Sequence, residues 1–304
     1  MNAGAATDCG LVRGRNEDRY WIDAGRGVFL VVDGVGGQAA GDLAAEIAVS
    51  EIQESLCDSG AGAFACQPDN PQPPAEQRIR AAITRANNRI FELAQADAAR
   101  RGMACVLTLA VLEDGEITIG HVGDSRLYLV WRGAMRKLTS DHSPVGEEEE
   151  AGVLSEQEAM SDSRRNEVFR DVGSGPRSAV DEDFIDIRRC RFRPDAAILL
   201  CSDGLTDQLT AAEVREVIAG YDGDAERVAR DLVAAARAAG GKDNATALFV
   251  AGPEFGTRTS ATRLRQPASS ARGRRYRVLG RLAYLAGGLL LGMLVWVVLR
   301  AAGG

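Results

Sequence analysis

The hydrophobic positions of the chain follow two periods, which divide it into predicted helices and strands. Apolar residues recur at helical spacing over residues 38–56 and 75–101, so two long amphipathic helices are expected there. A second helix pair is expected over residues 210–220 and 225–239. Short apolar or alternating runs predict strands. These runs lie at 29–32, 106–112, 117–122, 127–131, 184–192, 198–202 and 247–250.

The order of these elements indicates the fold class. Strands are followed by a helix pair, several more strands, a second helix pair and a last strand. The links between neighbouring strands are of hairpin length, and Asp114-Gly115 is typical of a tight turn. Such links leave no room for the crossovers of a parallel sheet. The sequence therefore predicts a layered α+β protein dominated by antiparallel sheet.

A polar stretch at residues 144–180 interrupts the strands and is expected to form a mobile surface subdomain. Ser155 and Glu158 have the spacing of a capping box, which predicts the start of a short helix. The acidic run at residues 147–150 is expected to be a solvated face.

Charge is distributed unevenly along the chain. Residues 1–250 carry 27 basic and 42 acidic side chains, whereas residues 251–304 carry nine arginines and one acid. The resulting net charges are −15 and +8. A body this acidic is a poor partner for nucleic acid, so no nucleic-acid binding is expected.

The basic tail contains 18 consecutive uncharged residues, Leu282 to Leu299, between Arg281 and Arg300. This length is sufficient to cross the hydrocarbon core of a membrane. A buried core helix is the alternative, but the run follows a polar linker and lies near the end of the sequence. We expect a basic flexible linker at 253–277 and a transmembrane helix at 278–300. Arginines crowd the N-terminal flank, so the body should face the cytoplasm, with the tail contacting membrane lipid.

The cysteines and histidines limit the possible chemistry. The six cysteines are scattered and form no Cys-x-x-Cys pair, so free thiols are expected rather than disulfides. Only two histidines are present, which argues against a multi-histidine zinc site or a zinc finger.

Acidic residues that follow apolar runs suggest a site for hard cations. Asp33-Gly34 follows one run, Asp203-Gly204 follows another, and Asp124 and Asp243 each lie beside a β-like run. A single Asp-Gly pair is more often a turn, but here several such acids occur together with the charged stretch 13–18. Oxygen donors of this kind select Mg²⁺ or Mn²⁺. Two such ions could activate water for hydrolysis of a phosphate monoester, while an arginine neutralises the phosphoryl oxygens.

These residues resemble the motif set of the metal-dependent type 2C (PPM) Ser/Thr protein phosphatases, in their bacterial form. The resemblance covers residues 7–250 in the order of the family. It implies a phosphatase domain at 1–252, built as a four-layer β-sandwich of two antiparallel sheets flanked by helix pairs, with a flap at about 144–180. The matching stretches lie at 10–18, 32–37, 120–126, 138–143, 170–173, 200–207 and 243–246.

The resemblance also assigns metal ligands. Asp33 would bridge two metal ions and would be central to catalysis, and Gly34 would offer its backbone carbonyl to one of them. Asp203 and Asp243 would bind the other ion. Asp124 would form a third, weaker site together with Asp203, so two and at most three Mg²⁺ or Mn²⁺ ions are implied.

Three further residues complete the implied site. Glu17 and Asp18 would hold metal-bound waters or complete a coordination shell, and Arg13 would clamp the substrate phosphate. Substrates would be proteins phosphorylated by a Ser/Thr kinase. With the expected tail, the protein would be a single-pass protein of the cell inner membrane, its N-terminal catalytic domain in the cytoplasm.

Two departures from the family pattern are visible. Val35 stands where eukaryotic members have a histidine thought to protonate the leaving group, so no general acid is assigned. Met103-Ala104-Cys105 replaces the usual Gly-Thr-Thr, which should alter packing near the cleft without touching the metals.

Two other functions were weighed. A catalytically weak, phosphatase-like binding module in a membrane signalling complex is the main alternative, although every expected metal ligand is intact. A calcium-binding membrane anchor is disfavoured because the chain has no twelve-residue acidic loop.

Overall fold

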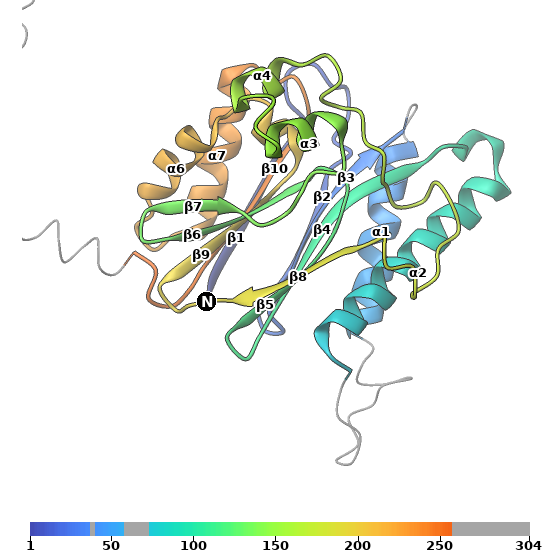
Figure 1. Cartoon of the computed structure of the whole chain (residues 1–304), viewed down its shortest axis with the longest axis horizontal. Helices are drawn as coiled ribbons and strands as arrows, with labels where there is room; N and C mark the ends of the chain where they lie inside the picture. The colour runs from blue at the N-terminus through green and yellow to red at the C-terminus, as the bar shows by residue number, and fades with distance from the viewer. Residues whose placement is uncertain (37–39, 58–72, 257–304) are drawn as a thin grey trace, which may run out of the picture. The chain divides into compact units, whose positions relative to one another are not determined.

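The computed structural model describes residues 1–36, 40–57 and 73–256, which form two five-stranded antiparallel sheets packed face to face (Figure 1). The first sheet has the order β1 (Asn2–Asp8), β10 (Ala245–Ala251), β9 (Ala196–Cys201), β6 (Arg126–Trp131) and β7 (Ala134–Lys137). The second has the order β2 (Arg19–Asp23), β3 (Val28–Val35), β4 (Ala104–Glu113), β5 (Glu116–Val122) and β8 (Asp186–Arg191). The predicted antiparallel sandwich is confirmed.

Helix pairs cover the two outer faces. One pair is α1 (Ala40–Cys57) and α2 (Ala75–Ala96), followed by the short 3₁₀ helix η2 (Ala98–Arg100), and the other is α6 (Ala211–Ala219) and α7 (Ala225–Ala239). Three short helices lie in the connections: α3 (Pro144–Glu150), α4 (Glu156–Ser161) and α5 (Asp203–Thr206). The capping box predicted at Ser155 is formed, and a second one, between Thr210 and Glu213, begins α6.

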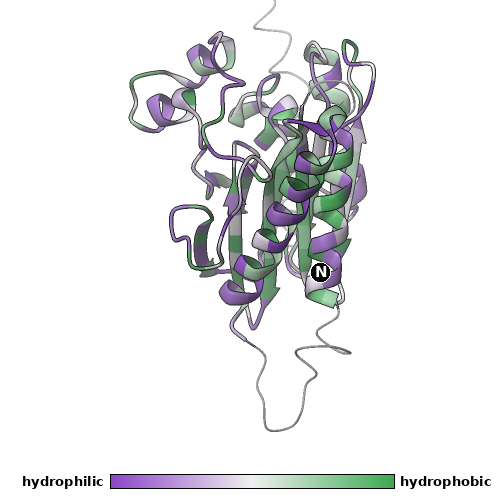
Figure 2. Ribbon diagram, turned by 90° about the vertical axis from the view of Figure 1, so that its right-hand side faces the viewer, coloured by the Kyte–Doolittle hydropathy of each residue, from purple (hydrophilic) through white to green (hydrophobic). Residues whose placement is uncertain are grey.

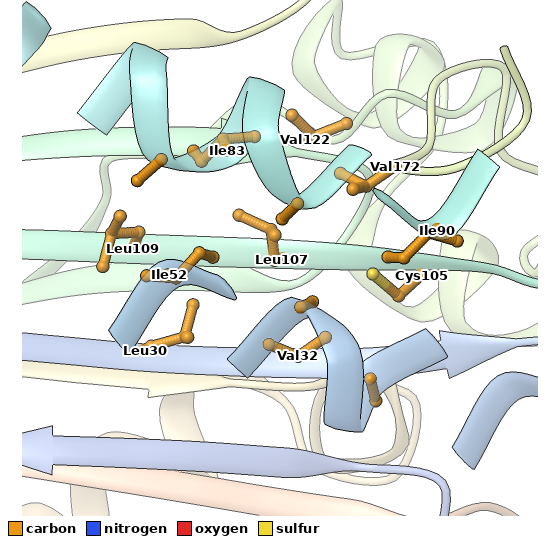
Figure 3. Packing of buried hydrophobic residues seen from close by; sticks show 14 of the residues in the cluster. Leu30, Val32, Ile52, Ile83, Ile90, Cys105, Leu107, Leu109, Val122 and Val172 are labelled. Carbon is orange, nitrogen blue, oxygen red and sulfur yellow. The ribbon is translucent and has the colours of Figure 1, made fainter. Parts of the chain in front are cut away.

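Three hydrophobic clusters fill the three spaces between these four layers. The apolar run of β3 is continuous because this strand is buried on both faces. Leu30 and Val32 point toward α1 and α2, whereas Phe29 and Val31 point into the space between the sheets. Figure 3 shows the first of these clusters, and Figure 2 shows hydrophobic residues gathered on the sheets and on the helix sides that face them. Burying a side chain of this size contributes about 1.5–3 kcal/mol.

Strand β1 was not predicted, because its small residues give no hydrophobic period. Small residues are nevertheless what the packing requires. A Cβ atom on Gly4 would lie 2.3 Å from the backbone of Glu226, so the close approach of α7 to this strand depends on glycine. Strand β1 pairs with β10 over all seven of its residues.

The second predicted helix is shorter than expected. It ends at Ala96, and Asp97 then adopts an extended conformation and caps η2 by accepting a hydrogen bond from the Ala99 amide. The polar, alanine-rich stretch near residue 100 continued the helical pattern in sequence, but the chain must turn there to enter β4.

The predicted linker and transmembrane helix lie outside the described residues, apart from residues 253–256. Among the helices that are described, none combines the length and the apolar character needed to cross a bilayer. Cys9, Cys57, Cys105, Cys190 and Cys201 all carry free thiols, as predicted.

Candidate active site

The sequence-predicted site residues converge at one end of the sandwich, because loops from both sheets meet there. The connection between β1 and β2 carries Arg13, Glu17 and Asp18, and the last residues of β3 carry Asp33 and Gly34. Asp124 lies between β5 and β6, Asp203 begins α5 directly after β9, and Asp243 precedes β10. All of these residues except Asp18 line one cavity of about 300 Å³.

The Asp33-Gly34 pair lies where three segments approach one another closely. The Gly34 amide donates a hydrogen bond to the Glu17 carbonyl oxygen at 3.2 Å. A Cβ atom on Gly34 would lie 2.2 Å from the carbonyl oxygen of Gly41 in α1, so no larger residue fits without moving the backbone. Glycine at this position therefore holds the carboxylate of Asp33 beside the β1–β2 loop.

Asp18 lies beneath the cavity and is 1% exposed. Its Oδ2 accepts hydrogen bonds from the hydroxyls of Ser202 at 2.7 Å and Thr246 at 2.6 Å. Its Oδ1 has no hydrogen-bond partner within the described part of the chain. Burial raises the pKa of Asp18 to about 6. A buried carboxylate oxygen without a hydrogen-bond partner is suited to bind a cation or a water molecule that a cation holds.

The remaining acids of the cavity oppose one another's ionisation. Burial, followed by the charges of Asp18 and Asp203, raises the pKa of Asp33 well above its usual range. Burial and the charge of Asp124 do the same for Asp203. Burial and Asp141 raise the pKa of Asp124 to about 7. Several buried carboxylates can lie this close together only if they share protons or if a bound cation neutralises their charge.

The donor set fits Mg²⁺ or Mn²⁺, since every candidate ligand is an oxygen atom. Within residues 1–36, 40–57 and 73–256, no three His, Cys, Asp or Glu side chains stand in a ready coordination arrangement. The Oδ2 atom of Asp243 accepts a 2.6 Å hydrogen bond from the Arg13 guanidinium. This bond raises the pKa of Arg13.

Asn244 organises the loop that carries Arg13 and Glu17, a role that the sequence did not suggest. Its Oδ1 accepts a hydrogen bond from the Glu17 amide at 2.8 Å, and its Nδ2 donates to the carbonyl oxygens of Cys9 and Arg15. Ser202, Thr246 and Asn244 were therefore missed as site residues. The available signal was their position within three residues of Asp203 or Asp243.

Gly204 provides a prediction about how α5 is positioned. A Cβ atom there would lie 1.9 Å from the Asn244 carbonyl oxygen, so Gly204→Ala must push α5 away from β10. We expect a loss of at least about 2 kcal/mol in the free energy of unfolding, measured by urea denaturation. Gly175→Ala is the control, because a Cβ atom at Gly175 meets nothing within 4 Å. Equal stability of the two variants would contradict the packing described here.

The predicted flap region is joined to the sheets by ion pairs. Arg126 at the start of β6 binds Asp141 and Glu149, and Arg165 binds Asp207 at 2.5 Å. Burial opposes ionisation of Asp141, but Arg126 and Lys137 hold its pKa below the usual value. The interpretation of residues 147–150 as a solvated face holds for Glu147 and Glu150, which are exposed, but is wrong for Glu149, which α3 turns inward onto Arg126.

The two histidines lie side by side behind the Asp124 loop, with ring centroids 4.9 Å apart. His142 accepts a hydrogen bond from the Gly123 amide at Nδ1, so its Nε2 carries the proton and faces Asp186 at 3.2 Å. Burial and His142 lower the pKa of His121 to about 4. These contacts fix the turn that presents Asp124.

Cys105 belongs to the second departure from the family pattern, Met103-Ala104-Cys105. Its backbone exchanges two hydrogen bonds with Val172, at 3.0 and 2.8 Å, and its side chain is fully buried in the cluster between β4 and α2. The altered sequence at 103–105 is thus buried, and its effect on packing near the cleft stays a prediction.

Comparisons with known proteins agree with this site. Residues 14–242 match the sequence model of the family described as protein phosphatase 2C. The Serine/threonine phosphatase stp of Listeria innocua is 32% identical over 253 residues, which are 82% of this chain and 95% of that protein.

Solved structures give the same result. The serine/threonine phosphatase PstP/Ppp of Mycobacterium tuberculosis aligns with a TM-score of 0.70 and 25% identity, over 83% of this chain and 98% of that one. The catalytic domain of PstP in complex with two manganese ions aligns with a TM-score of 0.67 and 25% identity, over 82% of this chain and 96% of its own.

Proposed function

The chain belongs to the protein phosphatase 2C family and is a protein-serine/threonine phosphatase, and from this premise we propose how it acts. It hydrolyses phosphoserine and phosphothreonine monoesters in proteins with the help of two Mg²⁺ or Mn²⁺ ions. The observation that carries this proposal is the convergence of five acidic side chains and Arg13 on one cavity.

The acidic residues of the cavity would bind the metal ions. Asp33, Asp203 and Asp243, with the backbone carbonyl of Gly34, would hold the two ions, and Asp124 would add a third site beside Asp203. Ions bound there would lower the pKa of a water molecule, which would make it a nucleophile for phosphorus near neutral pH, and would neutralise phosphoryl charge.

The other residues prepare the cavity for a phosphate group. Arg13 is half exposed and reaches across the mouth of the cavity to Asp243, so its guanidinium can bind phosphoryl oxygens. Asn244 keeps the Arg13 loop in place through three hydrogen bonds. Val35 has no proton to give, so the leaving oxygen is not protonated by the residue at that position.

Substrate and location follow from the family and from the sequence of the tail. The substrates are proteins phosphorylated by a Ser/Thr kinase. Residues 278–300 would anchor the protein in the cell inner membrane, with the catalytic domain in the cytoplasm. The supporting features are the uncharged run 282–299 and the arginines that precede it.

The test is metal-dependent turnover by the full chain. A phosphothreonine peptide should be hydrolysed in the presence of Mn²⁺, turnover should cease when the ion is chelated, and it should return when Mn²⁺ is restored. Titration calorimetry should show at least two Mn²⁺ ions per chain. Binding of the phosphopeptide without turnover at any metal concentration would instead identify a phosphatase-like binding module.

A further inference from the structure

A group of exposed arginines lies along one edge of the sandwich and does not line the catalytic cavity. They come from the β6–β7 turn, from β7, from the middle of β8 and from the β8–β9 turn, and β7 and β8 are edge strands of their sheets. We call this group the arginine edge. Its members are Arg132, Arg136, Arg188 and Arg193.

The four side chains gather around two residues that lie between the sheets. The guanidinium groups of Arg132 and Arg193 lie over the ring of Trp131, at 4.5 and 4.9 Å from its centroid. Arg136 and Arg188 both act electrostatically on the thiol of Cys190, whose pKa burial raises and they lower. We group the two pairs as one patch because they lie along the β7 and β8 edges of the two sheets.

The patch stands out because the rest of the domain is acidic. Residues 1–256 carry 27 basic and 43 acidic side chains, a net charge of −16. In the described part of the chain, only Arg193 of the arginine edge pairs with a carboxylate, that of Asp195. Arg188 donates to the Leu138 carbonyl oxygen, which leaves its positive charge uncompensated. Exposed positive charge without partners is suited to an anionic surface.

The chain leaves the domain beside this patch. The Gly252 amide donates to the Ala196 carbonyl oxygen and the Glu254 amide to that of Pro194, so the last described residues lie against the start of β9. Arg193 directly precedes that turn. In Figure 1 the β6–β7 turn and the exit of the chain both lie at the left, whereas α3 and α4 lie at the top.

Two members of the arginine edge, Arg132 and Arg193, lie at the opposite end of β6 and β9 from the cavity, whereas Arg136 and Arg188 lie opposite the middle of β6 and β5. Strand β6 begins two residues after Asp124 and ends at Trp131. Strand β9 begins at Ala196, near the chain exit, and ends two residues before Asp203. A strand of six residues spans about 20 Å, so a surface bound at Arg132 and Arg193 leaves the cavity open at the other end of these strands.

We propose that the arginine edge binds the headgroups of anionic membrane lipids and orients the catalytic cavity away from the bilayer. Trp131 suits this position because tryptophan favours the interface between lipid and water. Each arginine near an anionic membrane strengthens binding by about fivefold. The proposal does not depend on phosphatase activity, since lipid binding is measured separately.

The experiment uses residues 1–256, so that the basic tail cannot contribute. This part is one compact unit that contains all three hydrophobic clusters, and a solved relative consists of little else, so it folds by itself. It should sediment with vesicles of phosphatidylglycerol and phosphatidylcholine, and not with phosphatidylcholine alone. Replacing all four arginines of the edge with glutamine should weaken binding at least tenfold.

A matched variant loses four exposed arginines elsewhere and should bind as the wild type does. The four control substitutions are Arg89→Gln, Arg101→Gln, Arg215→Gln and Arg230→Gln. Both variants should hydrolyse p-nitrophenyl phosphate at the wild-type rate, which shows that they are folded.

Three outcomes would overturn the proposal. They are absence of wild-type binding to anionic vesicles, equal loss of binding in both variants, and binding to an acidic peptide in preference to vesicles. The last would assign the patch to an acidic protein. In the full chain, hydrogen exchange at 131–136 and 186–195 should slow in nanodiscs that contain phosphatidylglycerol and stay unchanged in neutral ones.

Discussion

Replacing Asp203 with asparagine is expected to lower kcat by about a thousandfold or more, the largest effect among the predicted substitutions. Asp203 lies at the start of α5. Its charge raises the pKa of Asp33, and the charge of Asp124 raises the pKa of Asp203. The variant keeps the size of the side chain and loses one anionic ligand, so Mn²⁺ binding should weaken. Phosphopeptide turnover and Mn²⁺ calorimetry measure these two effects.

The same substitution should raise thermal stability in the absence of metal. Folding raises the pKa of Asp203, so an ionised Asp203 costs free energy in the folded state at neutral pH, and asparagine removes that cost. Added Mn²⁺ should then stabilise the variant less than the wild type. Asp231→Asn, on the exposed face of α7, is the control and should change neither quantity. Full turnover by the Asp203 variant would remove this carboxylate from the mechanism.

Replacing Arg13 with alanine should lower kcat/KM for a phosphopeptide by about a hundredfold to a thousandfold, because phosphoryl oxygens lose their guanidinium partner. Arg13→Lys should recover only part of the loss, since an ammonium group cannot bind two oxygens side by side. Inorganic phosphate should also inhibit the alanine variant more weakly. Steady-state kinetics with and without phosphate measure both effects.

Arg15→Ala is the matched control for Arg13. Arg15 lies in the same loop and is exposed, but it does not line the cavity. Its backbone carbonyl, which accepts a hydrogen bond from Asn244, is unaffected by the change. Its kinetics should stay within about twofold of the wild type, as is usual for surface substitutions. A similar loss in both variants would mean that loop charge alone, rather than a specific phosphate contact, is responsible.

The sequence predicted those parts of the fold and site that leave a local signal. The run before Asp33 is apolar at every position because β3 is buried on both faces, and the glycine after it is required by the approach of Gly41. Acids at strand ends followed by glycine were therefore recognisable. Strand β1 left no such signal, since its alanines and glycine fit against α7 without a hydrophobic period.

Contacts between distant segments could not be predicted in the same way. Ser202 and Thr246 bind Asp18 across 184 and 228 positions of the sequence, and Arg13 reaches Asp243 across 230. Each of these residues is an ordinary polar residue when considered alone. Only the meeting of the first loop with the last two strands gives them a role.

The pairing of β1 with β10 has a consequence for synthesis of the protein. Strand β1 is synthesised before the other described strands, but its hydrogen-bonding partner, β10, is the last of them. Asp243 and Asn244, which complete the cavity, also come from that final segment. Because domains generally fold as units, a nascent chain gains its metal-binding centre only after nearly the whole domain has been translated. Products of premature termination before β10 would thus be unable to dephosphorylate cellular proteins.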